Sequence, residues 1–204
     1  MVRTVAIAAV IAVLGVLGAT WFLGSGPFEQ AGLEQCSSSS VAGADIGGPF
    51  ELINGAGETV TDADVITEPS LVYFGYTYCP DVCPFDVARN ADAIDILAEQ
   101  GVNATPVFIT IDPQRDTQDV VADYASNMHD RMIALTGSPE QVDAASKAYK
   151  TYYKAQRDGT DEYLVDHSTF TYLVLPKQGF VEFFRRDVTA EQMAQSVTCF
   201  AENS

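Results

Sequence analysis

The sequence is short of positive charge. It contains 11 lysines and arginines against 28 aspartates and glutamates, which gives a formal net charge of −17 over 204 residues. A surface of this charge repels a phosphate backbone, so we expect no nucleic-acid partner. It is compatible with cations and with cationic protein surfaces.

Cysteine and histidine are also scarce. Four cysteines are too few for a scaffold built on disulfides, but they are enough for one site and one cross-link. The two histidines limit any imidazole-containing site to His129 or His167. With 47% hydrophobic and 19% charged residues, the chain is neither disordered nor fibrous, and it can bury a full core. Its length suits one domain with an appendage.

The longest stretch without charge lies at the amino terminus. A helix over residues 5–23, at ~1.5 Å per residue, spans roughly 28 Å, which is about the thickness of the hydrocarbon core of a bilayer. Arg3 precedes the stretch, while Trp21 and Phe22 lie at its far end, where interfacial aromatic residues are common. We therefore predict a cytoplasmic segment 1–4, a transmembrane anchor over this stretch, and a soluble domain facing the periplasm from the inner membrane.

Two alternatives stay open for this segment. A cleaved signal peptide would usually have a hydrophobic run of only ~7–15 residues. A lipoprotein would need a lipobox before Cys36, which the sequence Leu-Glu-Gln over 33–35 does not resemble. Residues 24–46 are rich in glycine and serine and show no periodicity, so we predict a linker there and a folded domain over 47–204.

The domain alternates segments typical of strands and helices. The apolar runs predict strands over 50–53, 58–60, 71–76, 107–111, 132–135, 152–155, 163–165, 169–175 and 180–184. Helical spacing predicts helices over 84–100, 116–128, 138–149 and 189–200, and the last three are expected to be capped by Asp116, Ser138 and Thr189. This order indicates an α/β fold with a mixed sheet and an extra N-terminal hairpin. It matches a thioredoxin-like layout, with a cysteine motif between a central strand and a helix.

The cysteine motif is Cys-Pro-Asp-Val-Cys-Pro over 79–84. Because proline is favoured at the first helical position, Pro84 indicates that a helix starts there and that Cys83 lies near its cap. Free amide groups and the helix dipole favour thiolates at such a place. Cys79 and Cys83 can therefore form a redox-active disulfide or bind a soft metal. A structural disulfide is the plainer alternative.

One histidine is well placed to join the two cysteines. His167 precedes the strand over 169–175, and in a thioredoxin-like sheet the loop entering that strand lies beside the cysteine motif. Two thiolates and one imidazole suit copper, or part of a zinc site. Asp166 is a candidate to orient His167 or to steer cations, although an aspartate in a loop is often only exposed. His129 lies at a polar helix end and is expected to be a solvated capping residue.

Three motifs together resemble those of the Sco (SenC) family. They are the run GYTYCPDVCP over 75–84, IDPQRDT over 111–117 and VDHS over 165–168, and the resemblance covers roughly residues 45–202. It implies a membrane-anchored, thioredoxin-fold copper chaperone that holds Cu(I) or Cu(II) on Cys79, Cys83 and His167. The implied target is the CuA site in subunit II of cytochrome c oxidase, with an upstream copper donor or thiol reductant as a further partner. Tyr78, where many members carry histidine, departs from the pattern at a position that is not a ligand.

The resemblance also implies a second activity. A thiol–disulfide oxidoreductase would reduce the cysteines of the oxidase subunit before copper arrives, so whether the chain is also an enzyme stays open. Thioredoxin-type reductases carry a cis-proline before the strand that corresponds to 169–175. This chain has no proline between Pro139 and Pro176, and His167 occupies that region.

The remaining features have two interpretations each. Cys36 and Cys199 are expected outside the membrane, where free thiols are uncommon, so they either form a disulfide or stay free. The charged cluster of Asp112, Arg115 and Asp116 is either a docking or loop-fixing element, or an ion-paired turn with a helix cap. The tyrosines at 149, 152, 153 and 163 are expected to pack in the core and a hairpin.

Overall fold

The computed structural model describes residues 33–37, 45–157, 159–160 and 162–204. Within these ranges no helix is both long enough and apolar enough to cross a bilayer. The predicted anchor over 5–23 lies outside the described residues. Within the stretch predicted as a linker, Leu33–Gln35 form a 3₁₀ turn, η1, and Leu33 and Cys36 are buried.

A seven-stranded mixed sheet forms the centre of the domain, in the order β2-β1-β5-β4-β3-β8-β9. Its strands are β1 (Glu51–Asn54), β2 (Thr59–Thr61), β3 (Ser70–Gly75), β4 (Thr105–Thr110), β5 (Ile133–Thr136), β8 (Thr171–Leu175) and β9 (Gly179–Phe184). Strands β3, β4 and β5 run parallel, whereas β1 and β8 pair antiparallel with β5 and β3. Strands β6 (Tyr153–Ala155) and β7 (Val165–His167) form a separate two-stranded sheet.

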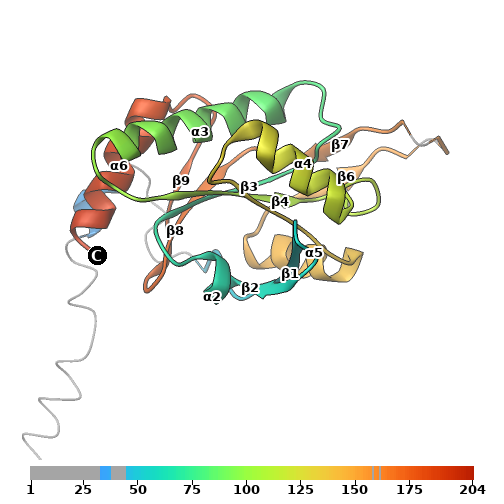
Figure 1. The fold of residues 1–204 in the computed structure, drawn as a ribbon, viewed down its shortest axis with the longest axis horizontal. Helices are drawn as coiled ribbons and strands as arrows, with labels where there is room; N and C mark the ends of the chain where they lie inside the picture. The colour runs from blue at the N-terminus through green and yellow to red at the C-terminus, as the bar shows by residue number, and fades with distance from the viewer. Residues whose placement is uncertain (1–32, 38–44, 158, 161) are drawn as a thin grey trace, which may run out of the picture.

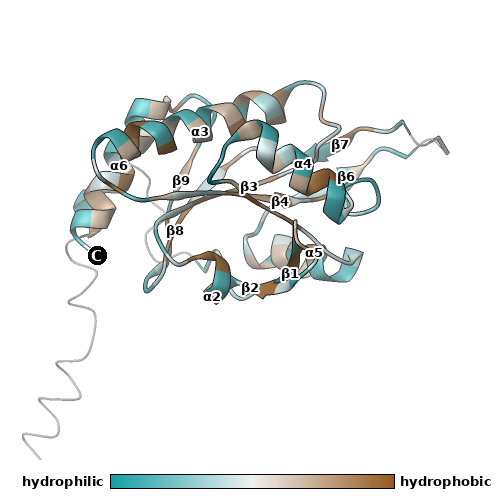
Figure 2. Ribbon diagram, in the orientation of Figure 1, coloured by the Kyte–Doolittle hydropathy of each residue, from teal (hydrophilic) through white to brown (hydrophobic). Residues whose placement is uncertain are grey.

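Helices cover both faces of the sheet (Figure 1). They are α2 (Asp62–Val65), α3 (Val82–Glu99), α4 (Gln118–Met128), α5 (Pro139–Ala148) and α6 (Ala190–Glu202). Helices α3, α4 and α6 lie on one face, while α2 and α5 lie on the other. Figure 2 shows hydrophobic residues concentrated on the central strands, and every residue of β3, β4 and β8 is buried. The core therefore lies against both faces of these three strands.

The predicted fold class is confirmed. The sheet is mixed, a hairpin of β1 and β2 precedes the central strands, and the cysteine motif follows β3 and leads into α3. The sequence pattern missed the short helix α2. It also placed the start of α3 two residues too late, because Asp81 is the N-cap and Cys83 and Pro84 lie within the first turn. Proline is tolerated there because the first amide groups of a helix have no partner within the helix.

The predicted cap at Asp116 is wrong. Thr117 is the N-cap of α4, and the carboxylate of Asp116 turns inward instead. Both other capping predictions are confirmed, since Ser138 accepts a hydrogen bond from the amide of Gln141 and Thr189 accepts one from the amide of Gln192.

A disulfide joins the start of the described chain to its last helix. Cys36 and Cys199 are bonded, with 5.6 Å between their Cα atoms, so the first of the two interpretations is confirmed. The hydroxyl of Ser37 also donates to the buried carboxylate of Glu182 in β9 at 3.0 Å. These contacts attach residues 33–37 to the side of the domain formed by β9 and α6.

Candidate metal centre

The two motif cysteines lie at the carboxyl end of the central strand. Cys79 is in the loop after β3 and Cys83 is in the first turn of α3, and both side chains are buried, with 7% and 0% exposed. Neither takes part in a disulfide. The amide of Cys83 donates a hydrogen bond to the sulfur of Cys79 at 3.3 Å. The start of α3 therefore provides a backbone donor that favours a thiolate at Cys79.

Gly75, the last residue of β3, allows this close approach. A Cβ atom at this position would lie 3.2 Å from the sulfur of Cys83, 2.8 Å from the ring of Tyr73 and 3.0 Å from that of Phe108. Only a residue without a side chain leaves these three groups in place. Any larger residue would force the ring of Tyr73 to move and would crowd the ring of Phe108 and the sulfur of Cys83.

Asp116 holds the loop that carries Cys79. Its carboxylate accepts hydrogen bonds from the amide of Thr77 at 3.0 Å and from the hydroxyl of Thr77 at 2.6 Å. It also accepts one from the hydroxyl of Thr110, at the end of β4, at 2.6 Å. Burial is the main cause that raises the pKa of Asp116, and these three donors act against it. The loop-fixing interpretation of the charged cluster is therefore confirmed for this residue.

The β6–β7 hairpin brings His167 to the cysteines. Its Nε2 atom lies 3.3 Å from the sulfur of Cys83, across 84 positions of sequence. Its Nδ1 atom lies 2.7 Å from the carbonyl oxygen of Ser168. Because a carbonyl can only accept, Nδ1 must carry the proton, which leaves the lone pair of Nε2 directed at the cysteines. The imidazole is thus held in the tautomer that a metal ligand requires.

Two tyrosine rings enclose the imidazole edge to face. The ring centroids of Tyr73 and Tyr76 lie 6.2 Å and 5.9 Å from that of His167, at interplanar angles of 85° and 86°. The hydroxyl of Tyr73 donates to the buried carboxylate of Asp86 at 3.1 Å. The hydroxyl of Tyr76 accepts from the amide of Val165 at 3.3 Å. These contacts restrict rotation of the imidazole and limit the access of water to one side of the site.

The three side chains offer one compact set of donors. The sulfurs of Cys79 and Cys83 and a ring nitrogen of His167 all lie within 4.8 Å of one another. A trigonal ion with metal–ligand distances of ~2.3 Å needs donors roughly 4 Å apart, so small shifts of the three donors, with Cys83 and His167 moving slightly apart from 3.3 Å, would complete the geometry. Two soft sulfurs and an imidazole form a suitable three-ligand site for copper. They would be an incomplete site for zinc, which prefers four ligands.

The two thiols ionise as a coupled pair. A hydrogen bond from the Cys83 side chain holds the pKa of Cys79 well below its ordinary value, and the backbone amides of Cys83 and Asp81 lower it further. The same bond to Cys79, together with burial, raises the pKa of Cys83. Near neutral pH the metal-free site therefore carries one thiolate, at Cys79, and one thiol, at Cys83.

Asp166 does not orient the imidazole. Its carboxylate accepts a hydrogen bond from the side chain of Gln156, and its side chain is exposed. The carbonyl of Ser168 has the orienting role that the sequence pattern suggested for Asp166. The other suggestion, that Asp166 steers cations to the site, stays a prediction.

The other residues singled out by sequence lie as follows. His129 is the C-cap of α4, and its Nε2 atom lies 3.2 Å from a carboxylate oxygen of Asp95, away from the donor cluster. Tyr149 is buried in the core, as expected. Tyr152 is exposed, with 57% of its surface accessible, so the expectation of packing is wrong for this residue.

Sequence reasoning missed several groups that shape the site. Gly75, Tyr73, Tyr76, Thr77 and Ser168 had no assigned role, although four of them lie within the motifs that were recognised. Their positions next to Cys79 and His167 were the only available signal. Nothing in their spacing shows that Tyr76 contacts Val165 or that Ser168 contributes its carbonyl rather than its hydroxyl.

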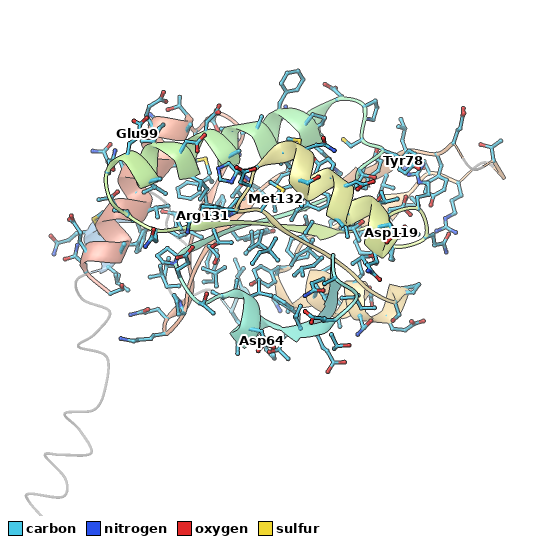
Figure 3. The ribbon with its side chains drawn as sticks, in the orientation of Figure 1. Asp64, Tyr78, Glu99, Asp119, Arg131 and Met132 are labelled. Carbon is cyan, nitrogen blue, oxygen red and sulfur yellow. A yellow bond between two sulfur atoms is a disulfide. The ribbon has the colours of Figure 1, made fainter. Side chains whose placement is uncertain are left out.

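The large exposed hydrophobic side chains lie close in sequence to the donors or to residues that contact them. In the described part of the chain the large ones are Tyr78, Phe85, Tyr152, Leu164 and Phe170. Tyr78 and Phe85 flank the two cysteines in sequence, and Leu164 and Phe170 lie three residues before and after His167. The amide of Tyr152 donates to the hydroxyl of Ser168 at 3.0 Å. Figure 3 shows Tyr78 at one end of the molecule and Glu99, the last residue of α3, at the other. We call these five side chains the hydrophobic rim.

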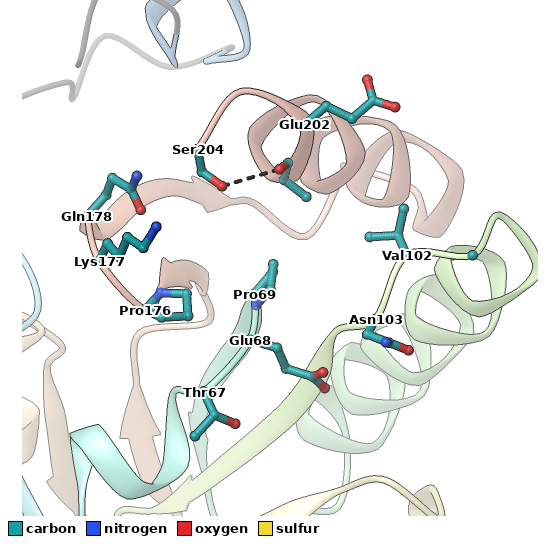
Figure 4. Close-up of a pocket in the computed structure, with 12 residues that line it drawn as sticks. Thr67, Glu68, Pro69, Val102, Asn103, Pro176, Lys177, Gln178, Glu202 and Ser204 are labelled. Atoms are coloured by element: carbon teal, nitrogen blue, oxygen red, sulfur yellow. Dashed lines mark hydrogen bonds between the residues drawn. The ribbon is translucent and has the colours of Figure 1, made fainter. Parts of the chain in front are cut away.

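A hollow lies at the end of the sheet opposite the three donors (Figure 4). It has a volume of about 510 Å³ and is lined by residues before β3 and β4 and by the chain end, among them Glu68, Asn103, Lys177 and Ser204. Glu68 is already paired with Arg131 and with the hydroxyl of Thr105. This hollow contains none of the three donors and is unrelated to the chemistry described above.

Comparison with known proteins gives consistent matches. The family model described as SCO1/SenC matches residues 38–202. Over 201 residues the chain is 52% identical to protein SenC of Rhodobacter capsulatus, covering 98% of this chain and 91% of that protein.

Two solved structures with copper bound share the fold. The ScoI structure from Arabidopsis thaliana is 38% identical with a TM-score of 0.73, covering 77% of this chain and 99% of that one. Yeast Sco1 is 32% identical with a TM-score of 0.70, covering 76% and 87% of the two chains. The thioredoxin-like layout predicted from the sequence is therefore confirmed.

Proposed function

The chain belongs to the SCO1/SenC family, and from that premise we propose that it is a copper chaperone for cytochrome c oxidase. In this proposal copper is the cargo, bound by Cys79, Cys83 and His167 and passed to the CuA site of oxidase subunit II. The observation that carries the proposal is the cluster of two sulfurs and one imidazole nitrogen within 4.8 Å of one another. Relatives of 38% and 32% identity have been solved with copper bound.

The direct test is a copper titration of the protein with Cys79 and Cys83 reduced. Cu(II) binding is followed by thiolate-to-copper charge-transfer absorption, and Cu(I) binding by competition with a chelator. One tight equivalent, transferred on mixing to a reduced CuA domain, supports the proposal. Failure to bind copper specifically would refute it.

Three protein ligands leave a position on the ion open. A ligand from a partner can enter there before one of the chaperone's ligands leaves, so copper need not be released into water. Oxidation of Cys79 and Cys83 to a disulfide removes two electrons and both thiolate ligands, so the redox state of the pair controls loading. This couples copper binding to a thiol reductant as the further partner.

The hydrophobic rim supports transfer to a protein rather than release of a free ion. A contiguous patch of exposed hydrophobic side chains beside a site indicates contact with another protein surface. Phe85, in the second turn of α3, is 70% exposed and lies two residues after Cys83. The rim and the open coordination position would then face the partner together.

We expect Phe85→Ala to slow copper transfer to a CuA domain by roughly three- to tenfold, because the variant loses apolar contact with the partner. Copper affinity should change by less than about twofold, since Phe85 supplies no donor. Stopped-flow transfer from the loaded protein measures the rate. Glu99→Ala, on an exposed position at the far end of the same helix, is the matched control and should transfer at the normal rate. An unchanged rate in Phe85→Ala would exclude this residue from docking.

Copper binding should release about one proton near neutral pH, rather than two. Cys79, whose pKa is lowered, has already lost its proton, whereas Cys83, whose pKa is raised, must lose one on binding. Affinity should therefore rise about tenfold per pH unit between pH 7 and 8. Calorimetry of the reduced protein in two buffers of different ionisation enthalpy counts the protons. A value near two would show that both cysteines are protonated in the metal-free site.

A thiol–disulfide oxidoreductase is the second candidate. In that reaction Cys79 and Cys83 would transfer two electrons to a disulfide of the oxidase subunit and become a disulfide themselves. The lowered pKa of Cys79 favours its attack on a disulfide. The position of His167 favours copper, because such a reduction needs no imidazole. Rapid disulfide exchange that is unaffected by His167→Ala, without copper binding, would support the reductase.

Membrane attachment is part of the proposal. Residues 5–23 would anchor the protein in the inner membrane and place the domain in the periplasm, where cytochrome c oxidase exposes CuA. Protease added to spheroplasts should digest the domain, whereas intact cells should protect it. Protection in spheroplasts would place the domain in the cytoplasm instead.

A further inference from the structure

The three donors belong to two separate parts of the fold. Cys79 and Cys83 lie on the body of the domain, at the junction of β3 and α3. His167 lies in β7, which pairs only with β6, in the register Tyr153↔His167. In the described residues no strand of the main sheet pairs with this hairpin, so apart from its chain connections to α5 and β8 it is held at the body by side-chain contacts.

One arginine contacts both parts. Arg115 follows β4, and its guanidinium carbon lies 3.7 Å from the ring centroid of Tyr163, just before β7. It also lies 5.0 Å from the centroid of Tyr78 and 5.6 Å from that of Tyr76, both in the loop that carries Cys79. Arg115 is thus placed between the cysteine loop and the histidine hairpin.

An aspartate completes the same contact. The buried carboxylate of Asp112 pairs with Nε of Arg115 and accepts a hydrogen bond from the hydroxyl of Tyr163 at 2.7 Å. The side chain of Arg115 is itself only 14% exposed, so water screens these contacts weakly. A planar guanidinium can stack on an aromatic ring and bond a carboxylate at the same time, whereas an ammonium group cannot do both in this geometry.

We propose that Arg115 is a positioning residue that sets His167 against the cysteine pair. Tyr163, four residues before His167, is held against the body by Arg115 and Asp112. Val165, two residues before His167, is held there by its hydrogen bond to the hydroxyl of Tyr76. The separation between Nε2 of His167 and the sulfur of Cys83 then depends on Arg115. This inference rests on the proposed function, because the position of His167 matters through copper binding.

The first test needs no metal. Hydrogen exchange of the full chain is compared between the wild type and Arg115→Lys, which keeps the charge but loses the stacking. We expect the amides of Val165 and Ser168 to exchange about tenfold faster in the variant. Arg131→Lys, which alters an ion pair with Glu68 at the other end of the sheet, is the matched control and should leave these amides unchanged. Equal exchange in Arg115→Lys and the wild type would overturn the proposal.

The second test asks whether Arg115 acts through His167. We expect Arg115→Lys to weaken copper binding about tenfold in the wild type and by less than about twofold in a His167→Ala background. Equal losses in both backgrounds would mean that Arg115 acts on the thiolates directly, which would overturn the positioning role. If the wild type binds no copper, the proposed function fails, and hydrogen exchange alone decides the placement of the hairpin.

A milder variant covers the case in which Arg115→Lys does not fold. Tyr163→Phe removes the hydroxyl that bonds Asp112 but retains the ring under Arg115. We expect hydrogen exchange at Val165 and Ser168 to rise about threefold. No change in this variant, combined with a misfolded Arg115→Lys, would assign Arg115 to the stability of the domain and overturn the positioning role.

Discussion

Replacing Cys83 by serine should weaken copper binding on the order of a thousandfold. The hydroxyl of serine is a hard, neutral donor at physiological pH, so the variant loses a soft anionic ligand that copper prefers. Serine is slightly smaller than cysteine and fits the fully buried position beside Gly75, so the fold should be retained. Competition with a chelator for Cu(I), under conditions that keep the remaining thiol reduced, measures the loss.

Two further variants make this result specific. His167→Ala should weaken copper binding less than Cys83→Ser, because both thiolates remain. Changing both Cys36 and Cys199 to serine removes two sulfurs that are not part of the site. This double variant should keep copper affinity within about twofold of the wild type, since the two residues form a disulfide between residues 33–37 and α6. Tight binding in Cys83→Ser, or equal losses in all three variants, would contradict the site described here.

The same double serine variant should be substantially less stable. The disulfide joins residues separated by 163 positions, so it excludes many extended states of the unfolded chain. We expect its removal to lower the free energy of unfolding by about 2–4 kcal/mol. Urea denaturation of the chain from Gly24 onward, with copper absent, gives the value for the wild type and the variant.

The expected destabilisation has a local component as well. Leu33 and Cys36 are buried in a hydrophobic cluster with residues of α3 and α6, and Ser37 bonds to Glu182. Without the disulfide this segment can detach, which would expose that cluster and the carboxylate. Surface substitutions usually change the free energy of unfolding by no more than about 0.5 kcal/mol. A change within that range in the double serine variant would mean that the segment stays attached through its other contacts.

Much of the site was predictable because its parts are local. The fully buried run of β3, the proline after Cys83 and the helical spacing of α3 place the two cysteines at the carboxyl end of a strand. The disulfide between Cys36 and Cys199 was one of two interpretations that followed from the number of cysteines and the expected compartment. The structure decided between them.

The wrong predictions concern contacts between distant segments. Asp116 has the residue type and position of a helix cap, but it bonds to Thr77, which lies 39 positions earlier. Asp166 adjoins His167 in sequence, yet the strand geometry directs its side chain toward Gln156. Tyr152 is as hydrophobic as Tyr149, but only Tyr149 faces the core. In each case a pattern of neighbouring residues could not indicate the direction of the side chain.

The sequence by itself determined which donors this protein has: two thiols at the junction of a strand and a helix, one imidazole, and a scarcity of other candidates. It also determined the order of strands and helices, because apolar spacing and capping residues act over a few positions. Only the tertiary structure decided how far apart the donors lie and which tautomer the imidazole adopts. Those depend on packing between Cys83 and His167 across 84 positions, on the carbonyl of Ser168, and on the contact of Arg115 with the hairpin.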